Sequence, residues 1–359
     1  MTATGRQGET VHVTRMGRAF ARRWLPLCSL VFLVALLTGC QLDTAQSTTV
    51  IAGTHNAEVW NSYRVIFWLA GLVFVVVMLL TLWISIRFRE RPGVSAQQIH
   101  GNTKLEVLWT LIPVAIVVVM AVPTITSIQR EAQWPPADAI KVIAIGHQWW
   151  FEFQYPDLKI NTANELHIPV NKPIAFEIRS NDVIHSFWVP QLAGKIDMMP
   201  GHVNSIWFAG TVARPEPYLG QCAELCGLSH ANMRFRVFVD TPEDFNSWAQ
   251  KVKSATPAPS DSLARQGQEV FQRSACIGCH TIQGTTAAGI VGPNLTLLGQ
   301  RTTIASGTIP NTADNLFRWI NNSAAIKPGS LMPPMGQSAG GALSDDEIRA
   351  VSAYLLSLK

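Results

Sequence analysis

A short stretch of the chain carries four residues of the kinds that bind soft metal ions. It reads Gly220-Gln-Cys-Ala-Glu-Leu-Cys-Gly-Leu-Ser-His-Ala-Asn-Met233, with spacings of four, four and three residues between the two cysteines, the histidine and the methionine. Such a loop can wrap one site with two thiolates, an imidazole and a thioether. Soft sulfur ligands hold Cu(I) and imidazole tolerates Cu(II), so the pattern favours copper. A second imidazole lies upstream in Asp182-Val-Ile-His-Ser186, and two thiolates with two histidines could hold two copper ions.

Three other interpretations of Cys222 and Cys226 compete with a dinuclear copper site. A disulfide suits an oxidising compartment, but it leaves His230 and Met233 without a role. Structural zinc is disfavoured because a thioether is a poor zinc ligand. A single blue-copper site needs only one cysteine. These alternatives stay open on the residues alone.

A second redox motif follows about 50 residues later, at Cys276-Ile-Gly-Cys279-His280. This C-x-x-C-H pattern is the attachment signature of c-type haem. Two thioether bonds would hold the haem, and His280 would be one axial ligand of its iron. A thioredoxin-like cysteine pair is the alternative. It is disfavoured because no βαβ pattern surrounds the motif and a helix is expected before it, from Leu263 to Arg273.

The other axial ligand of the haem iron is expected to be a methionine on a later loop. The segment Lys327-Pro-Gly-Ser-Leu-Met-Pro-Pro-Met-Gly336 offers two. Met332 begins a Met-Pro pair that resembles the ligand loop of class I cytochromes c, so we favour it and expect Met335 to pack on the ring. The last helix is expected to start at the capping box Ser344-x-x-Glu347 and to press its apolar face on the helix before the haem motif.

Composition limits the classes of protein that could carry these motifs. The chain has 359 residues, which predicts two or three folded units at roughly 100 to 200 residues each. Charged residues make up only 14%, against about 25% in typical soluble proteins, while 48% are hydrophobic. The apolar residues are therefore expected in blocks, and disorder is excluded. A net charge of +4 is too small for the dense basic patches of nucleic-acid-binding proteins.

The N-terminus has the pattern of a secretory signal. Four arginines within residues 15–23 precede the uncharged run Trp24 to Leu37, whose 14 residues are short for a membrane span of about 20. The run ends in Leu37-Thr-Gly-Cys40, which resembles a bacterial lipobox, so Cys40 is expected to be the lipidated first residue of the mature protein. An ordinary signal, or a first membrane helix with an incidental cysteine, is the alternative. Cys28, inside the removed signal, has no expected role.

Two later runs are long enough to cross a membrane. Val65 to Ile86 and Val107 to Ile128 each contain 22 residues without a charge. The loop between them is rich in arginine and lysine, so the positive-inside rule places it in the cytoplasm and everything after the second span outside. Pro113 and Pro123 predict a kink or an early end of the second helix. Glu106 either completes a capping box with Thr103 or collects protons at the cytoplasmic face.

The region after the spans is expected to form a β domain. Lys141 to Ile145, Ile174 to Arg179 and Phe235 to Val239 show alternating or β-branched patterns, and frequent prolines separate them. Short strands with many turns predict a sandwich or a Greek-key barrel. The Pro/Ala/Ser-rich segment from Ser254 to Asp261 then predicts an extended, semi-rigid linker.

Together the membrane hairpin, the segment Gly146-His-Gln-Trp-Trp150, His185 and the copper loop resemble subunit II of haem–copper cytochrome c oxidases, over about residues 55–240. The resemblance implies a cupredoxin fold that holds a mixed-valence dinuclear copper centre, bridged by Cys222 and Cys226. The remaining implied copper ligands are His185, His230, Met233 and the backbone carbonyl of Glu224.

The resemblance also implies roles outside the copper ligand set. The Glu224 side chain would help to hold magnesium at the interface with subunit I. Trp149 matches the ring through which electrons arrive, although Trp150-Phe151 stands where Tyr-Trp is commoner, which leaves the choice between Trp149 and Trp150 open. Glu106 matches a glutamate near the mouth of a proton channel. The copper ligands argue against quinol as the donor, because related quinol oxidases lack them.

The fold class expected is a membrane-anchored multidomain protein with a two-helix transmembrane hairpin, an all-β cupredoxin Greek-key barrel and an all-α class I cytochrome c domain. The expected divisions are a lipoprotein signal at 1–39, an extracytoplasmic segment at 40–62, the hairpin at 63–129, the copper domain at 134–252, a linker at 253–262 and the cytochrome c domain at 263–359.

The function implied is that of the subunit through which electrons enter a haem-c-fused (caa-type) cytochrome c oxidase of a bacterial cell membrane, with its redox domains on the periplasmic side. Electrons would pass from a donor cytochrome c through haem c and copper to haem in subunit I, where dioxygen is reduced to water and protons are translocated. Other oxidase subunits are expected partners, and nucleic acid is not. The alternatives are the same module in a copper-dependent nitric oxide reductase, or a stand-alone membrane electron carrier or copper-delivery lipoprotein.

Overall fold

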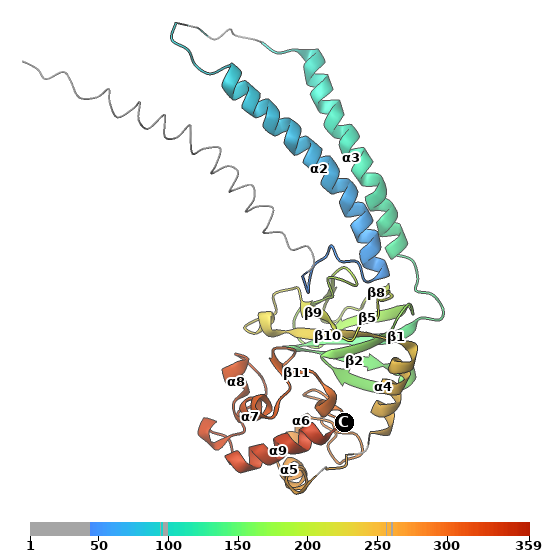
Figure 1. The fold of residues 1–359 in the computed structure, drawn as a ribbon, viewed down its shortest axis with the longest axis vertical. Coiled ribbons are helices and arrows are strands. Elements are labelled where there is room, and N and C mark those ends of the chain that lie inside the picture. Colours follow the sequence, from blue (N-terminus) through green and yellow to red (C-terminus); the bar gives the residue numbers. More distant parts are fainter. Residues whose placement is uncertain (1–43, 94, 96–99, 256, 260) are drawn as a thin grey trace, which may run out of the picture. The chain divides into compact units, whose positions relative to one another are not determined.

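The computed structural model describes residues 44–359, apart from 94, 96–99, 256 and 260. The predicted signal and lipidation of Cys40 lie outside this part of the chain. Residues 48–359 form one compact unit. Its elements follow the order expected from the sequence, with two long helices first, then a β-rich region, then short helices (Figure 1).

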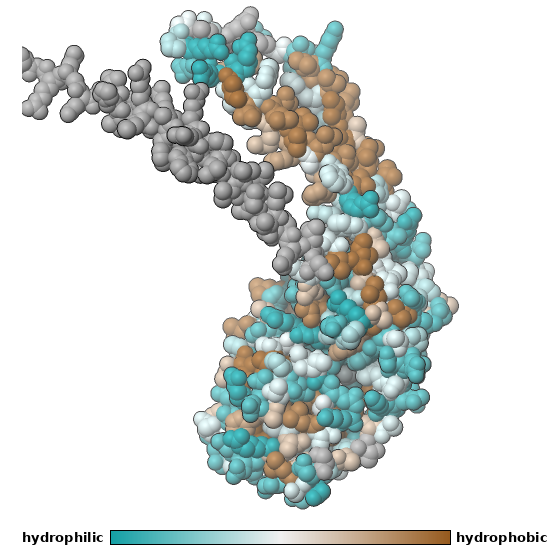
Figure 2. Space-filling view, viewed as in Figure 1, coloured by the Kyte–Doolittle hydropathy of each residue, from teal (hydrophilic) through white to brown (hydrophobic). Residues whose placement is uncertain are grey.

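The two long helices are α2 (Thr54–Arg87) and α3 (Thr103–Glu131), which lie side by side. Both are long and apolar enough to span a membrane, and neither apolar stretch is buried within the protein. Figure 2 shows the apolar side chains running along the hairpin. Both helices begin earlier and end later than the predicted spans, so they include polar residues on either side of each apolar run. The Ser62 and Ser127 hydroxyls, 2.7 Å apart, join the two helices by a hydrogen bond.

The structure corrects part of two expectations about the second helix. Of the kink or early end expected at Pro113 and Pro123, the early end does not occur, since α3 continues through both prolines to Glu131, and the kink stays a prediction. The N-cap is Asn102 and not Thr103, because the Asn102 side chain accepts from two backbone N–H groups in the first turn. Glu106 still contributes to this cap, as its Oε1 accepts from the Asn102 backbone N–H at 3.3 Å. A cap that includes Glu106 was predicted, but the N-cap residue is one position before the Thr103 that was expected.

The β-rich region contains two five-stranded sheets. The three predicted strands are confirmed, as β1, β5 and β10. Most neighbouring strands are antiparallel, but β1 pairs in parallel with β5, and β4 with β10. The first sheet has the order β3 (Ile160–Ala163), β2 (Trp150–Tyr155), β1 (Ile140–His147), β5 (Ile174–Ser180), β8 (Asn204–Phe208). The second has the order β4 (Glu165–Pro169), β10 (Arg234–Asp240), β9 (Tyr218–Cys222), β6 (His185–Trp188), β7 (Ile196–Met198).

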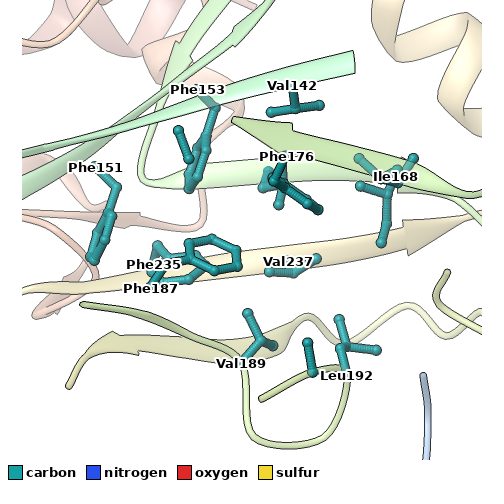
Figure 3. Close-up of a cluster of buried hydrophobic side chains, with 14 of the residues drawn as sticks. Val142, Phe151, Phe153, Ile168, Phe176, Phe187, Val189, Leu192, Phe235 and Val237 are labelled. Atoms are coloured by element: carbon teal, nitrogen blue, oxygen red, sulfur yellow. The ribbon is translucent and has the colours of Figure 1, made fainter. Parts of the chain in front are cut away.

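The two sheets enclose an aromatic core (Figure 3). Alternate residues along each strand point inward, as in β2, where every second side chain is fully buried. Phe235 of the second sheet stacks at 5.0 Å from Phe187 of the same sheet, and it lies 4.6 Å from Phe151 of the first. Each buried aromatic ring contributes roughly 1.5–3 kcal/mol by leaving water. This core makes the barrel a rigid support for the loops at its end.

The C-terminal region is helical and carries the haem motif. The helix α4 (Pro242–Ser254) closes the β domain, and Asp261 caps α5, so the predicted linker lies between these two positions. The remaining elements are α5 (Ser262–Arg273), α6 (Cys276–Cys279), β11 (Thr303–Ile304), β12 (Ile309–Pro310), α7 (Ala313–Asn321), α8 (Ser323–Ile326) and α9 (Asp345–Ser357), with 3-10 turns at Pro156–Leu158, His230–Asn232, Leu298–Gln300 and Gln337–Ala339.

The packing of α5 against α9 holds this helical domain together, as predicted. The capping box of α9 is present, with Ser344 and Glu347 bonded to each other's backbone N–H groups. Gly267 is buried where the two helices touch, and a Cβ atom there would lie 1.9 Å from the carbonyl oxygen of Ala350. The helices can approach this closely only because residue 267 has no side chain.

Replacing Gly267 with Ala should destabilise the helical domain by about 1–3 kcal/mol, because the added methyl group meets backbone that cannot rotate away. Helix propensity alone would favour Ala by about 1 kcal/mol, so the sign of the change separates the two effects. The measurement is the thermal unfolding of the domain, followed by the absorbance of its attached haem. The exposed neighbour Gln266→Ala is the control, and an unchanged midpoint for G267A would contradict the packing described.

Candidate copper and haem sites

The predicted copper ligands converge at one end of the β domain. His185 opens β6, Cys222 ends β9, and the loop that follows carries the remaining ligands up to the start of β10. The Cys222 Sγ atom lies 3.9 Å from His185 Nδ1, 3.8 Å from Cys226 Sγ and 3.2 Å from the Glu224 carbonyl oxygen. The Cys226 Sγ atom lies 3.7 Å from His230 Nδ1 and 3.9 Å from Met233 Sδ.

These separations fit a metal centre. Two ligands bound to one ion at about 2.0–2.3 Å, with tetrahedral angles, lie roughly 3.7 Å apart. Cys222 and Cys226 are both free thiols, so a disulfide does not occupy the loop. Donor atoms of His185, Cys222 and Cys226 all lie within 4.8 Å of one another. His230 is outside that group and faces Cys226 instead. The donor set of thiols, imidazoles and a thioether suits copper better than zinc.

The Asp182 carboxylate orients the first copper-ligand candidate. Its Oδ1 lies 2.7 Å from His185 Nε2, which leaves Nδ1 of that ring facing the thiols. Its Oδ2 accepts from the Gln148 backbone N–H at 2.6 Å. Burial opposes ionisation of Asp182, but the bonds from His185 and Gln148 outweigh it and hold the pKa of this carboxyl below its usual range. Gly146 makes room for the ring, since a Cβ there would lie 2.7 Å from His185 Cδ2.

The two thiols are poised to lose a first proton easily. The hydrogen bond from Cys226, with help from His185, lowers the pKa of Cys222 to about 3. The resulting thiolate in turn raises the pKa of the Cys226 thiol. Two adjacent thiolates therefore repel each other unless a cation lies between them, which is what a copper centre provides.

The backbone carbonyl of Cys226 joins the copper loop to the segment that begins β2. It accepts from the Gln148 side chain at 2.8 Å and from the Trp149 indole N–H at 3.0 Å. The Trp149 ring is almost fully buried, with 8% of its surface exposed. Trp150 stacks on His147 at 4.2 Å between ring centres. Of the two tryptophans predicted for electron transfer, Trp149 therefore bonds to the copper loop, whereas the contact described for Trp150 is with His147.

The haem residues line a single cavity. With the solvent at its open mouth included, the cavity encloses about 1340 Å³. The two cysteines and the histidine of the C-x-x-C-H motif line this cavity together with both candidate methionines and both tryptophans, namely Cys276, Cys279, His280, Met332, Met335, Trp149 and Trp150. The wall of the haem cavity thus includes residues from the copper domain.

His280 is prepared to bind iron with its far nitrogen. Its Nδ1 lies 2.8 Å from the Pro293 carbonyl oxygen, which fixes the tautomer and leaves Nε2 free for the cavity. Burial lowers the pKa of the imidazole, which favours the neutral form that metals bind. Gly292 lies against the ring, because a Cβ there would be 2.6 Å from His280 Cε1. Arg301 lines the same cavity and would offer its cation to the carboxylates of a haem.

Several of these residues were not predicted from the sequence. Asp182 stands three positions before His185, so the spacing was visible, but its second bond to Gln148 was not. In the sequence Lys327 stands out only as the start of the methionine loop, yet its side chain is 4% exposed and lies inside the protein. Two other residues were predicted from the sequence. Glu224 is half-buried in the copper loop, and Glu106 lies at the opposite end of the helical hairpin from the redox sites.

Comparison with protein families gives a consistent assignment along the chain. Residues 43–126 match the family described as cytochrome c oxidase subunit II, transmembrane domain. Residues 158–239 match cytochrome c oxidase subunit II, periplasmic domain, and residues 264–359 match cytochrome c. The three matches follow one another in the order of the helical hairpin, the β domain and the haem domain.

Individual relatives cover nearly the whole chain. Cytochrome c oxidase subunit 2 of Alkalihalophilus pseudofirmus is 36% identical over 346 residues, which are 94% of this chain and 97% of the relative. The subunit 2 of Bacillus subtilis is 31% identical over 360 residues, covering 94% and 98%. Among solved structures, the periplasmic domain of subunit II of cytochrome oxidase from Bradyrhizobium japonicum is 34% identical, covers 33% of this chain and 96% of its own, and gives a TM-score of 0.31.

Replacing Asp182 with Asn should weaken copper retention by about 10- to 100-fold, the usual effect of losing a partner that orients a metal ligand. Lowering the pH through the depressed pKa of Asp182 should act in the same direction, because protonation removes the same acceptor. The measurement is a competition titration with a copper chelator on the detergent-solubilised protein. Asp138→Asn, which alters only an exposed pair with Lys172, is the control. Equal retention in both variants would contradict the role of Asp182.

Met332→Ala should abolish the thioether–iron absorption band of the haem, because the iron loses its predicted sulfur ligand. Met335→Ala should keep that band, although Met335 lines the same cavity. Visible absorption spectra of the two oxidised variants make the comparison directly. The opposite pattern would assign the ligand to Met335.

Proposed function

The chain belongs to the cytochrome c oxidase subunit II family, in the form that carries a fused cytochrome c domain, and we propose that it passes electrons from a donor cytochrome c, by way of haem c and a dinuclear copper centre, to haem in subunit I. It is a subunit of a bacterial membrane oxidoreductase complex, anchored by the helical hairpin with its redox domains on the periplasmic side. Oxygen chemistry belongs to the catalytic subunit.

Haem c and copper, when bound, supply one-electron redox chemistry. For haem, Cys276 and Cys279 would form the thioether bonds, and His280 and Met332 would be the axial ligands. For copper, the cysteines and histidines described above would be the main ligands. Met233 and the Glu224 carbonyl would be weaker ones. The Glu224 side chain, half-buried next to these ligands, would hold magnesium at the contact with subunit I.

The arrangement of donors favours two copper ions over one. Each thiol has its own imidazole, since Cys222 faces His185 and Cys226 faces His230. A single ion bound by His185, Cys222 and Cys226 would leave two neighbouring donors without a metal. These donors are His230 and Met233. Two ions bridged by both sulfurs would use every donor. The bridging cations would also remove the repulsion between the thiolates.

The protein's own contribution is to keep the donors still. Two ligands are fixed on strands of a barrel with an aromatic core, and His185 is held from behind by Asp182. A one-electron change at a centre held in this way requires little movement of its ligands. Rigid ligation therefore favours rapid transfer in both directions.

One observation carries the proposed route between the two sites. The Trp149 indole donates to the carbonyl of the copper-ligand residue Cys226, and the same tryptophan lines the cavity that holds the haem motif. A single side chain therefore touches both sites. We favour Trp149 over Trp150 for the route on this ground. For Glu106, at the start of α3, we keep the proposal of proton collection on the cytoplasmic side, although its Oε1 also serves the helix cap.

The test of the proposed function is spectroscopic and uses the intact complex. Oxidised protein should show c-type haem together with the EPR hyperfine pattern of one electron shared by two copper nuclei. Reduction with a donor cytochrome should convert the haem spectrum to the ferrous form and remove the copper EPR signal, and the complex should then consume oxygen. The purified chain without subunit I should consume none. The reason is that dioxygen is reduced at a site in subunit I and not at the copper or haem ligands of this chain.

A copper signal with the hyperfine pattern of one nucleus would sink the dinuclear assignment while leaving the electron-transfer role intact. Cys226→Ser is the matched variant. It removes one bridging sulfur and should produce that single-nucleus pattern or lose copper altogether. If no large polytopic subunit accompanies the chain through purification in mild detergent, the oxidase assignment itself is wrong.

A further inference from the structure

Lys327 is an unusual residue at the contact between the haem and copper domains. Its side chain is 4% exposed, and no ion pair among the described residues includes it. A buried ammonium group without a counter-charge is costly, so it persists only where its N–H groups find acceptors. Burial lowers the pKa of this lysine to about 7, in agreement with that cost. The acceptors therefore explain why the side chain is there.

The acceptors belong to two different domains. The Nζ of Lys327 donates to the backbone carbonyl of Trp149 in the copper domain. It also lies 3.4 Å from the carbonyl of Ala305, in the turn between β11 and β12 of the haem domain. Lys327 itself ends α8 and starts the loop that carries Met332. One ammonium group thus joins the methionine loop, the β11–β12 turn and the tryptophan at the copper loop.

Neighbouring contacts show that Lys327 belongs to an extended interface. The Ser229 hydroxyl, inside the copper loop, donates to the Pro328 carbonyl at 2.5 Å. A Cβ at Gly329 would lie 2.8 Å from the Trp149 ring, so the methionine loop and this indole touch. The β11–β12 segment adds bonds from Thr302 to Glu165, from Ser306 to Asn164, between Arg234 and Ser306, from Arg236 to Gly307 and from Thr308 to Asn232.

We propose that Lys327 is a positioning residue for electron transfer within the chain, which holds the Met332 loop of the haem domain against the Trp149 side of the copper domain. The inference rests on the proposed function and adds that the two domains stay docked during transfer. The step moves one electron from ferrous haem c to the oxidised copper centre, and no bond is made or broken. Lys327 touches neither centre and acts through Trp149 and the loop.

A docked pair and a tethered pair behave differently. If the domains are held together, the transfer needs no diffusion, so its rate is independent of solvent viscosity. If they are only tethered by the linker near residues 255–261, each transfer waits for a productive encounter. Loss of docking should therefore slow the transfer and make its rate fall as solvent viscosity rises.

The variant Lys327→Met tests the proposal in the full-length oxidase complex, because methionine keeps an unbranched apolar stem and removes the ammonium group. Electrons are delivered to haem c by a photoreductant, and the appearance of reduced copper is timed with and without glycerol. We expect the wild type to be fast and insensitive to viscosity. We expect K327M to be slower by about tenfold or more, and slower still in glycerol. Lys251→Met, an exposed lysine on α4, is the matched control and should resemble the wild type.

Hydrogen–deuterium exchange gives a second readout that does not depend on electron transfer. The Arg234 amide donates to the Ser306 carbonyl at 3.1 Å, and the Thr302 amide donates to Glu165 at 2.8 Å, so both protons are protected by contact between the domains. K327M should speed exchange in the peptides that contain these amides, and K251M should not. If K327M does not assemble, Ser229→Ala, which removes the adjacent bond to Pro328, should produce the same changes to a smaller extent.

Four outcomes can be told apart. Slower, viscosity-dependent transfer with faster exchange supports the proposal. Unchanged rate and exchange in K327M overturn it, as does a slower rate that ignores viscosity, because that would reflect a change in driving force. Copper that is never reduced from haem c in the wild type would instead contradict the proposed function.

Discussion

The backbone carbonyl of Cys226 is the point on which the arrangement of the redox sites depends. It accepts from the Gln148 side chain and from the Trp149 indole, so the copper loop and the start of β2 cannot move independently. The Gln148 backbone in turn bonds to Asp182, which holds His185. A short chain of hydrogen bonds therefore links the backbone of Cys226, the imidazole of His185 and Trp149, which lines the haem cavity.

The surrounding architecture explains why these bonds persist. They lie at the end of a barrel whose aromatic core excludes water, and polar groups in such a place are costly to leave without partners. The haem domain adds to this end of the barrel, since Lys327 donates to the carbonyl of Trp149. The tryptophan is thus bonded on its indole side to the copper loop and on its backbone side to the haem domain. The two redox domains share one polar network.

Local sequence patterns predicted the sites, whereas contacts between distant residues were not predictable. The ligand spacings in the copper loop, the C-x-x-C-H motif and the Ser344 capping box are properties of short segments, and the structure places these segments as expected. The bond from Lys327 to Trp149 joins residues 178 positions apart, and no local pattern marks it. The cap at Asn102 was assigned to its neighbour because both residue types can cap a helix. Pro123 did not end α3, since tertiary and membrane context decides whether a helix continues.

We expect haem c and the copper centre to stand on opposite sides of Trp149, in domains that remain docked. Pulsed dipolar EPR on the oxidised intact complex measures this directly, because both centres then carry unpaired electrons. The account predicts a single narrow distribution of distances between haem iron and copper, unchanged by added glycerol. A broad distribution, or one that shifts with solvent, would show that the domains move freely on their linker and would contradict it.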